Sequence, residues 1–221
     1  PLNNILSQKR FFKDKFNLIF KANFNLFIRT FFILMSIIMF TAIGSRLGET
    51  ILAANAILII LQMFLSYSLD GFAQATEVLI GNEYGKKNKK KITKIIISSI
   101  IISFIFSILY SIIFYYYSMK IIELITPINE IIDECKNYIF WIIISPLISF
   151  LAFQLDGIYI GANKTIIMKN IFIISFIIYI ICLLIFVPIF NNHGLWASFI
   201  IFMFFRGLLL LSQYKKLYKF N

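Results

Sequence analysis

Long apolar stretches separated by short polar loops account for most of the chain. Six of these stretches reach the length of about 20 residues that a helix needs to cross the hydrocarbon core of a bilayer. They cover residues 24–44, 51–80, 95–117, 138–160, 166–189 and 195–214. The pattern predicts an all-α integral membrane protein with six transmembrane helices.

The second apolar stretch carries polar side chains within its length. Asn55, Gln62 and Asp70 lie within one broad face of a helix with about 3.6 residues per turn, and Gln74 and Glu77 continue the row toward one membrane surface. An acidic side chain in such a segment needs a partner, a water-filled cavity or a function. We expect the row to face the bundle interior as part of a cation, proton or substrate pathway. For Asn55 and Gln62, hydrogen bonding between helices is the alternative explanation.

The fourth apolar stretch combines Pro146 with Gln154 and Asp156. Asp156 is followed by a glycine, as Asp70 is, and it lies at a related depth of its helix. We therefore place Gln154 and Asp156 in the same pathway. A proline inside a membrane helix frees a backbone carbonyl and produces a kink. Pro146 is predicted to be a hinge, with a static bend as the alternative.

Two arginines are candidate counter-ions for these acids. Arg29 and Arg206 each lie within or near the inner third of an apolar stretch, and a paired buried charge is less costly than an isolated one. We predict a salt bridge from Arg206 to Asp156 or Asp70 and count Arg206 among the pathway residues. For Arg29, near the start of its stretch, we expect a side chain that extends to the lipid headgroups.

Composition agrees with a chain that resides in lipid, since 60% of the residues are hydrophobic, 14% are charged and the mean hydropathy is +0.88. The formal net charge of +11 does not indicate nucleic-acid binding, because the basic residues lie in short clusters between apolar stretches. Lys and Arg are retained on the cytoplasmic side of membranes, and the intervening loops are mostly acidic. Both chain ends are therefore predicted to be cytoplasmic. The basic clusters are Lys9, Arg10, Lys13 and Lys15; the lysines of residues 86–94; Lys164 and Lys169; and Lys215, Lys216 and Lys219.

The lysine run at residues 86–91 has more than one interpretation. Such a run is also typical of sites for anionic lipid headgroups or for nucleic acid. A simpler explanation is that the lysines hold this loop on the cytoplasmic side of the membrane, as the positive-inside rule describes. We therefore interpret the run as a positive-inside anchor, that is, as a charge cluster that sets the orientation of the neighbouring helices.

The sequence contains few features that would indicate an enzyme. Cys135 and Cys182 lack the spacing of a disulfide framework or a zinc site, and His193 is the sole histidine. There is no P-loop, zinc-protease or Ser-His-Asp motif, and the Asp-Gly pairs lack the flanking residues of intramembrane aspartyl proteases or membrane phosphotransferases. We expect no enzyme activity, no metal site and no cofactor. A proton or sodium gradient coupled through a carboxylate is the energy source that these residues support.

Four sequence blocks, in order along nearly the whole chain, resemble the multidrug and toxic compound extrusion (MATE) transporters, and most of all their branch named after DNA-damage-inducible protein F. The blocks are Leu52-Ala53-Ala54-Asn55-Ala56; Leu69-Asp70-Gly71-Phe72-Ala73 with Glu77 and Gly81; residues 152–162, which include Gln154-Leu155-Asp156-Gly157; and Asn192-His193-Gly194-Leu195-Trp196. Members of the family have twelve helices in two six-helix lobes related by a pseudo-two-fold axis. What resembles this chain is the C-terminal lobe.

The resemblance implies that residues 1–221 form the C-terminal half of a cation-coupled multidrug antiporter and that the N-terminal lobe lies outside this sequence. Such a protein exchanges protons or sodium for amphipathic, often cationic compounds by alternating access. The implied location is the plasma (inner) membrane of a prokaryote, crossed several times. The implied partners are the lipid bilayer, the substrate and the missing N-terminal lobe, in the same polypeptide or encoded separately, without nucleic acid.

Two other functions stay open at this point. One is a flippase for lipid-linked precursors of the same superfamily, and the other is a non-functional remnant of a split transporter gene. Because the chain begins with Pro1 rather than Met, we expect the sequence to be a piece of a longer polypeptide.

Overall fold

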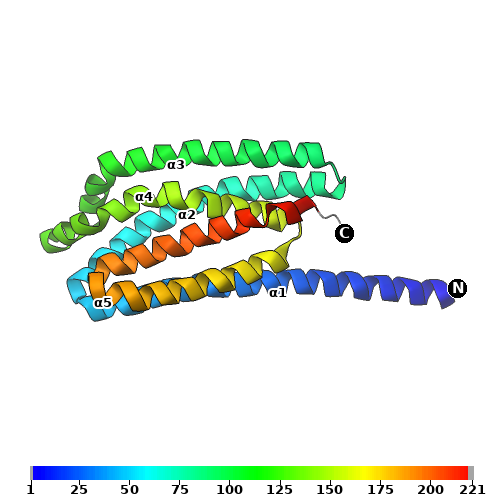
Figure 1. Ribbon diagram of the computed structural model, residues 1–221, viewed down its shortest axis with the longest axis horizontal. Helices are drawn as coiled ribbons and strands as arrows, with labels where there is room; N and C mark the ends of the chain where they lie inside the picture. The colour runs from blue at the N-terminus through cyan, green and yellow to red at the C-terminus, as the bar shows by residue number, and fades with distance from the viewer. Residues whose placement is uncertain (1, 219–221) are drawn as a thin grey trace.

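Five long helices make up the computed structural model, which describes residues 2–218 and the side chains of residues 16, 17 and 19–218 (Figure 1). They are α1 (Leu2–Leu47), α2 (Glu49–Gly85), α3 (Lys89–Ile125), α4 (Asn129–Gly161) and α5 (Thr165–Ser212), followed by the short 3-10 helix η1 (Tyr214–Tyr218). The described residues contain no strand. All five long helices are long and apolar enough to cross a membrane. The all-α membrane class predicted from the sequence is confirmed.

Helix α5 contains both of the last two predicted stretches, as two helical arms on either side of a kink, so all six predicted helical stretches are present within the five long helices. It has 48 residues and includes Asn191, whose backbone angles (φ 49°, ψ −126°) are not helical. The chain folds back there, and Figure 1 shows one arm in yellow and the returning arm in orange to red. A Cβ at Gly194 would lie 2.2 Å from the backbone oxygen of Phe186. A residue without a Cβ is therefore needed where the returning arm begins.

The helices extend beyond the apolar stretches. Helix α1 begins at Leu2 rather than at residue 24. Helix α2 has 37 residues, which corresponds to about 55 Å at about 1.5 Å per residue and exceeds a hydrocarbon core of about 30 Å. Backbone hydrogen bonding continues past the boundary of the hydrocarbon, so hydropathy marks the embedded part of a helix and not its end.

The start of α1 and the end of η1 lie at the same end of the bundle (Figure 1). This arrangement meets one requirement of the predicted orientation, in which both ends are cytoplasmic. The basic side chains of residues 9, 10, 13, 15 and 219, which contributed to that prediction, lie outside the described side chains. The assignment of this end to the cytoplasm stays a prediction.

Helix α4 lies at the centre of the fold. It packs against α2, α3 and α5, while α1 packs mainly on α5. Large side chains of α4 such as Phe153 and Tyr159 are buried, whereas Phe24, Phe27 and Phe31 of α1 are exposed. An exposed apolar surface of this kind is suited to contact with lipid or with another protein segment.

Two glycines allow α4 to approach α2 closely. Gly157 and Gly161 are one helical turn apart and lie on the same face of α4. Cβ atoms at these positions would lie 2.2 Å from the backbone oxygen of Ala73 and 2.4 Å from that of Glu77. Small residues with this spacing are typical of close helix contacts in membranes. The contact fixes where Asp156, the residue before Gly157, stands relative to α2.

Candidate functional site

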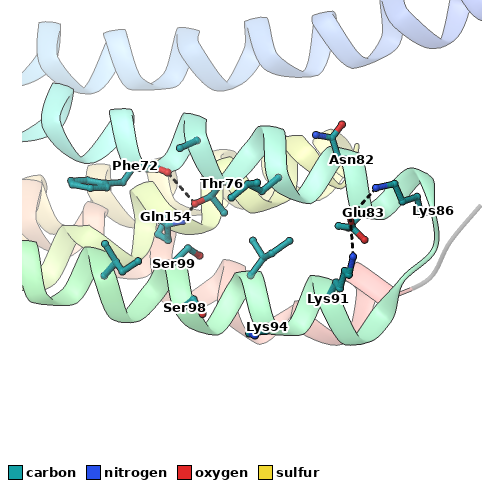
Figure 2. A pocket seen from close by; sticks show the side chains of 14 residues that line it. Phe72, Thr76, Asn82, Glu83, Lys86, Lys91, Lys94, Ser98, Ser99 and Gln154 are labelled. Atoms are coloured by element: carbon teal, nitrogen blue, oxygen red, sulfur yellow. Dashed lines mark hydrogen bonds and ion pairs between the residues drawn. The ribbon is translucent and has the colours of Figure 1, made fainter.

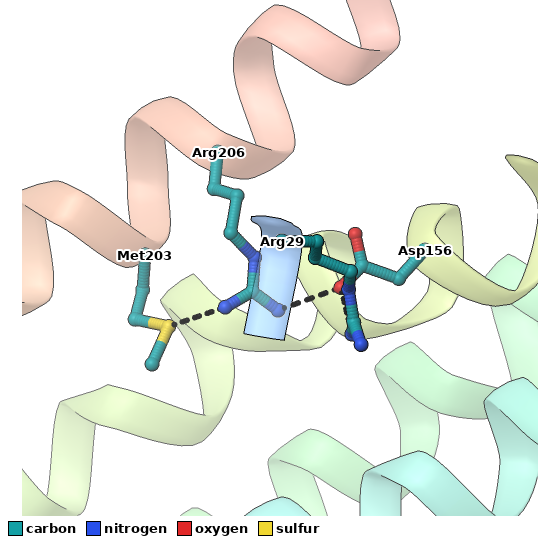
Figure 3. A network of polar contacts seen from close by, with 4 residues as sticks. All are labelled: Arg29, Asp156, Met203 and Arg206. Carbon is teal, nitrogen blue, oxygen red and sulfur yellow. Dashed lines mark hydrogen bonds and ion pairs between the residues drawn. The ribbon is translucent and has the colours of Figure 1, made fainter. Parts of the chain in front are cut away.

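An ion cluster in the interior of the bundle joins α1, α4 and α5. The carboxylate oxygen Oδ2 of Asp156 accepts hydrogen bonds from Nη2 of Arg29 at 2.7 Å and from Nη2 of Arg206 at 3.1 Å (Figure 3). The side chains of Asp156 and Arg206 are 2% and 1% exposed, and that of Arg29 is 18% exposed. The predicted salt bridge between Arg206 and Asp156 is confirmed.

The prediction that Arg29 extends to the lipid headgroups is wrong. Helix α1 packs on α5, and this packing brings Arg29 within 2.7 Å of the carboxylate of Asp156, 127 residues later in the sequence. A charge-assisted hydrogen bond to a buried carboxylate is stronger than a neutral one. The position of Arg29 in its own helix gave no indication of this partner.

Aromatic and sulfur-containing side chains surround the two guanidinium groups. The ring centre of Phe172 lies 5.3 Å from Cζ of Arg29 and 4.8 Å from Cζ of Arg206. The ring centre of Phe153 lies 5.1 Å from Cζ of Arg206, and Nη1 of Arg206 donates to the sulfur of Met203 at 3.3 Å. Cation–π contacts offset part of the desolvation of a buried cation. Sequence reasoning missed these residues, because with 26 Phe in the chain no single one is distinguished by type.

The ion cluster has an excess of positive charge unless a second carboxylate balances it. Two arginines share Asp156, and arginine stays protonated in proteins. Asp70 on α2 is close enough to interact electrostatically with both Arg29 and Arg206. Among the described residues, no hydrogen bond or salt bridge joins Asp70 to another side chain. When Asp70 is ionised, the four side chains are neutral as a group.

Asp70 lines a cavity of about 270 Å³ that also reaches the two arginines. The cavity lies between α1, α2 and α5, and Gln62 lines it about two turns of α2 away from Asp70. The remaining lining residues come from these three helices and from α4: Thr30, Ile33, Leu34, Ser36, Ile37, Ile59, Met63, Ser66, Tyr67, Phe153, Phe199 and Met203.

Several buried polar atoms beside this cavity have no hydrogen-bond partner in the described part of the chain. They are Nε2 and Oε1 of Gln62, Oδ1 of Asp156 and the Nε atoms of Arg29 and Arg206. Buried polar groups are nearly always hydrogen bonded, so these atoms require water or a solute as partners. Since a water takes about 30 Å³ of liquid volume, the cavity has room for several waters or a small organic group. The arrangement can hold a cation at Asp70 while both arginines stay paired with Asp156.

The polar row predicted along α2 is not one continuous track. Asn55 exchanges hydrogen bonds of 2.7 and 2.9 Å with Asn192 and accepts a third from Nε1 of Trp196 at 2.9 Å. This network ties α2 to the fold-back of α5, and it fits the alternative explanation for Asn55, hydrogen bonding between helices. Gln74 is exposed and Glu77 is half-buried. Neither of these two residues lines the cavity at Asp70.

Gln154 and Pro146 also stand apart from the ion cluster. The side chain of Gln154 accepts a hydrogen bond from Ser103 and donates one to Thr76, both at 2.6 Å, and so links α2, α3 and α4. Pro146 is buried within α4, which is assigned as one helix from Asn129 to Gly161. Its role as a hinge stays a prediction. In the described part of the chain, no group of three or more His, Cys, Asp or Glu side chains is arranged to hold a metal ion.

Comparison with known sequences reveals one matching family and a curated relative. The family model described as MatE matches residues 26–185. DNA damage-inducible protein F of Escherichia coli (strain K12) is 28% identical over 208 residues, which are 94% of this chain and 45% of that protein. The chain therefore spans about half the length of this curated relative.

Solved structures of larger transporters have a similar fold. A MOP superfamily transporter from Pyrococcus furiosus superposes with a TM-score of 0.79 at 17% identity, over 89% of this chain and 44% of that chain. The Vibrio cholerae MATE transporter VcmN in its bent form gives a TM-score of 0.77 at 17% identity, over 86% of this chain and 44% of that chain. At these identities the likeness concerns the fold. It agrees with the prediction that the chain corresponds to one lobe of a larger assembly.

Proposed function

Because the chain belongs to the MatE family, we propose that it forms the C-terminal half of a cation-coupled antiporter that exports amphipathic compounds. It acts as a transporter rather than an enzyme, in the plasma membrane of a prokaryote, together with an N-terminal lobe from the same polypeptide or a separate one. One observation carries the proposal: of two neighbouring carboxylates, Asp156 is held between two arginines, while Asp70 stands unpaired in the adjoining cavity.

Asp70 is the carboxylate that can exchange its ligand. A cation at Asp156 would have to compete with the hydrogen bonds from Arg29 and Arg206, whereas Asp70 has no such competitor. A proton or sodium ion on Asp70 removes its negative charge and leaves the arginines with one uncompensated positive charge. That charge repels a cationic substrate in the same cavity. Coupling ion and substrate therefore exclude each other at Asp70, and mutual exclusion is what antiport requires.

Glu77 and Gln74 extend the polar route from Asp70 toward the lysine-rich end of α2. They lie one to two turns beyond Asp70 on the same helix, half-buried and exposed, respectively. They do not line the cavity; in the proposed cycle they keep water at the surface of α2 between Asp70 and the lysine-rich end. The two lobes then rock between outward-open and inward-open states around the site.

A flippase for lipid-linked precursors is less well supported than an antiporter. Recognition of a pyrophosphate needs several basic side chains that are available to the ligand. The two arginines that line the cavity are both paired with Asp156.

The complete protein, reconstituted in proteoliposomes, is expected to move a fluorescent cationic dye when a proton or sodium gradient is imposed. The reason is the competition between ion and dye for Asp70. Dye movement is followed by fluorescence, and an ionophore that dissipates the gradient provides the control. Movement that persists without any gradient contradicts antiport, and no movement under either gradient supports a non-functional remnant.

Asp70→Asn is expected to reduce gradient-driven dye movement by about ten-fold or more, a change within the usual range of coupling free energies between two ligands. Asparagine keeps the shape of the side chain but cannot take up a proton or balance the arginines. Initial rates in proteoliposomes measure the effect. Glu123→Gln serves as the matched control, because Glu123 is exposed on α3 and lies outside the cavity. Equal rates in the two variants would remove Asp70 from the coupling mechanism.

A further inference from the structure

A second cavity, of about 620 Å³, forms a groove between α2 and α3 at their lysine-rich ends (Figure 2). Helices α2 and α3 both pack on α4, and Gln154 of α4 lines the groove between them. Figure 2 shows Glu83, Lys86 and Lys91 gathered at one end. The groove is separate in its lining from the cavity at Asp70, since no residue lines both.

The side chains that line the groove are charged at one end and uncharged further along each helix. On α3, lysines 91 and 94 are followed at helical spacing by Ile95, by Ser98 and Ser99, and then by Ile102. On α2, Lys86 is followed in the same direction by Asn82 and Glu83, then Leu79, Thr76 and Phe72. The charged side chains thus lie at the end of the groove, and a mixture of hydroxyl-bearing and apolar side chains lines it from there toward the middle of the bundle.

The charged end of the groove has a positive excess. Oε1 of Glu83 lies 2.9 Å from Nζ of Lys86 and 4.0 Å from Nζ of Lys91. For Lys94, no salt bridge to a described carboxylate is formed. Three lysines and one glutamate leave two positive charges, which favour an anionic group at this end.

The length of the groove matches one leaflet of a bilayer. Residues 72 to 86 of α2 advance about 21 Å at about 1.5 Å per residue, close to half of the ~40–45 Å that a bilayer measures with its headgroups. The apolar part is open at the surface of the bundle, since Leu79 is 53% exposed and Ile102 is 46% exposed. A lipid can enter it from the side without passing through the bundle.

We propose that this groove binds an anionic phospholipid of the adjoining leaflet. The phosphate lies at Lys94 and Lys91, the ester groups lie at the level of Ser98 and Ser99, and an acyl chain follows Leu79, Ile102 and Phe72. A positive-inside anchor accounts for the lysines as a run of charge. It does not account for a groove whose lining changes from charged to uncharged over the thickness of a leaflet.

Native mass spectrometry of the complete protein in detergent tests the proposal, with phosphatidylglycerol and phosphatidylcholine of identical acyl chains as probes. Phosphatidylglycerol is expected to bind more tightly. Lys94→Gln is expected to weaken that binding by about five-fold, the equivalent of about 1 kcal/mol for one lysine at an anionic headgroup. Ala75→Trp, which fills the groove from an exposed position of α2 without a change of charge, is expected to weaken binding of both lipids.

Lys90→Gln is the matched control, because Lys90 belongs to the same lysine run and is exposed but does not line the groove. Its affinity for phosphatidylglycerol should stay that of the unaltered protein. Equal affinity for the two lipids, or equal losses in Lys90→Gln and Lys94→Gln, would overturn the proposal in favour of general surface charge. Unchanged binding in Ala75→Trp would also overturn it, because the lipid would then lie outside the groove.

Discussion

Replacement of Asp156 by asparagine is expected to destabilise the bundle by about 3–5 kcal/mol, because it removes one partner of a buried charge network. Arg206 is 1% exposed and Arg29 is 18% exposed, and Asp156 is the acceptor for both. The uncharged amide of asparagine cannot neutralise either guanidinium. Unfolding of the complete protein in mixed micelles with a rising fraction of dodecyl sulfate, followed by circular dichroism, measures the change.

Asp133→Asn provides a matched control on the same helix. Asp133 forms an ion pair of 2.6 Å with Lys136, but the two side chains are 70% and 56% exposed. Exposed ion pairs contribute little to stability, so this variant should unfold like the unaltered protein. Equal stability of the two variants would show that Asp156 is not needed as a counter-ion. If Asp70 moves to the arginines in Asp156→Asn, the double variant with Asp70→Asn should lose more than the sum of the single losses.

Gly157→Ala is the second substitution for which a large loss of stability is expected. The added Cβ would lie 2.2 Å from the backbone oxygen of Ala73 and 2.7 Å from its carbonyl carbon. A side chain could rotate away, but backbone atoms can yield only if α2 and α4 move apart. We expect a loss near the upper end of the ~1–3 kcal/mol typical of overpacked cores. The same unfolding assay measures it.

Gly71→Ala is the control for this substitution, since Gly71 also follows an aspartate. Outside the neighbouring residues and backbone turns of α2 itself, no atom lies within 4 Å of a Cβ built on Gly71. Alanine favours a helix over glycine by about 1 kcal/mol, so the variant should be as stable as the unaltered protein or slightly more stable. A loss in Gly71→Ala equal to that in Gly157→Ala would contradict the close contact between α2 and α4.

Several features of the candidate site could be predicted from the sequence. The polar and charged side chains within apolar stretches identified Asp70, Asp156 and Arg206, because such residues are rare in lipid and need partners. The pairing of Arg206 with Asp156 was confirmed. The resemblance to the MATE transporters was confirmed by the family match.

Other features could not be predicted because they depend on contacts between distant segments. Arg29 was assigned to the headgroups although it binds Asp156. The place of Asn55 and Gln154 in a transport pathway stays a prediction, and the sequence did not show which other helices their side chains bond to. A polar residue in a membrane helix looks the same in sequence whether its partner is a neighbouring side chain, water or a solute.

The two Asp-Gly pairs separate what the sequence by itself determined from what the tertiary structure decided. The sequence determined the apolar stretches and the helical class, because a backbone in lipid must satisfy its hydrogen bonds within the segment, which is a local requirement. It also marked both aspartates as unusual. Only the packing of the helices made Asp156 the shared counter-ion of two arginines and left Asp70 beside a cavity. Pairing of charges depends on distances across the bundle, and these are set by close approaches such as that of Gly157 to Ala73.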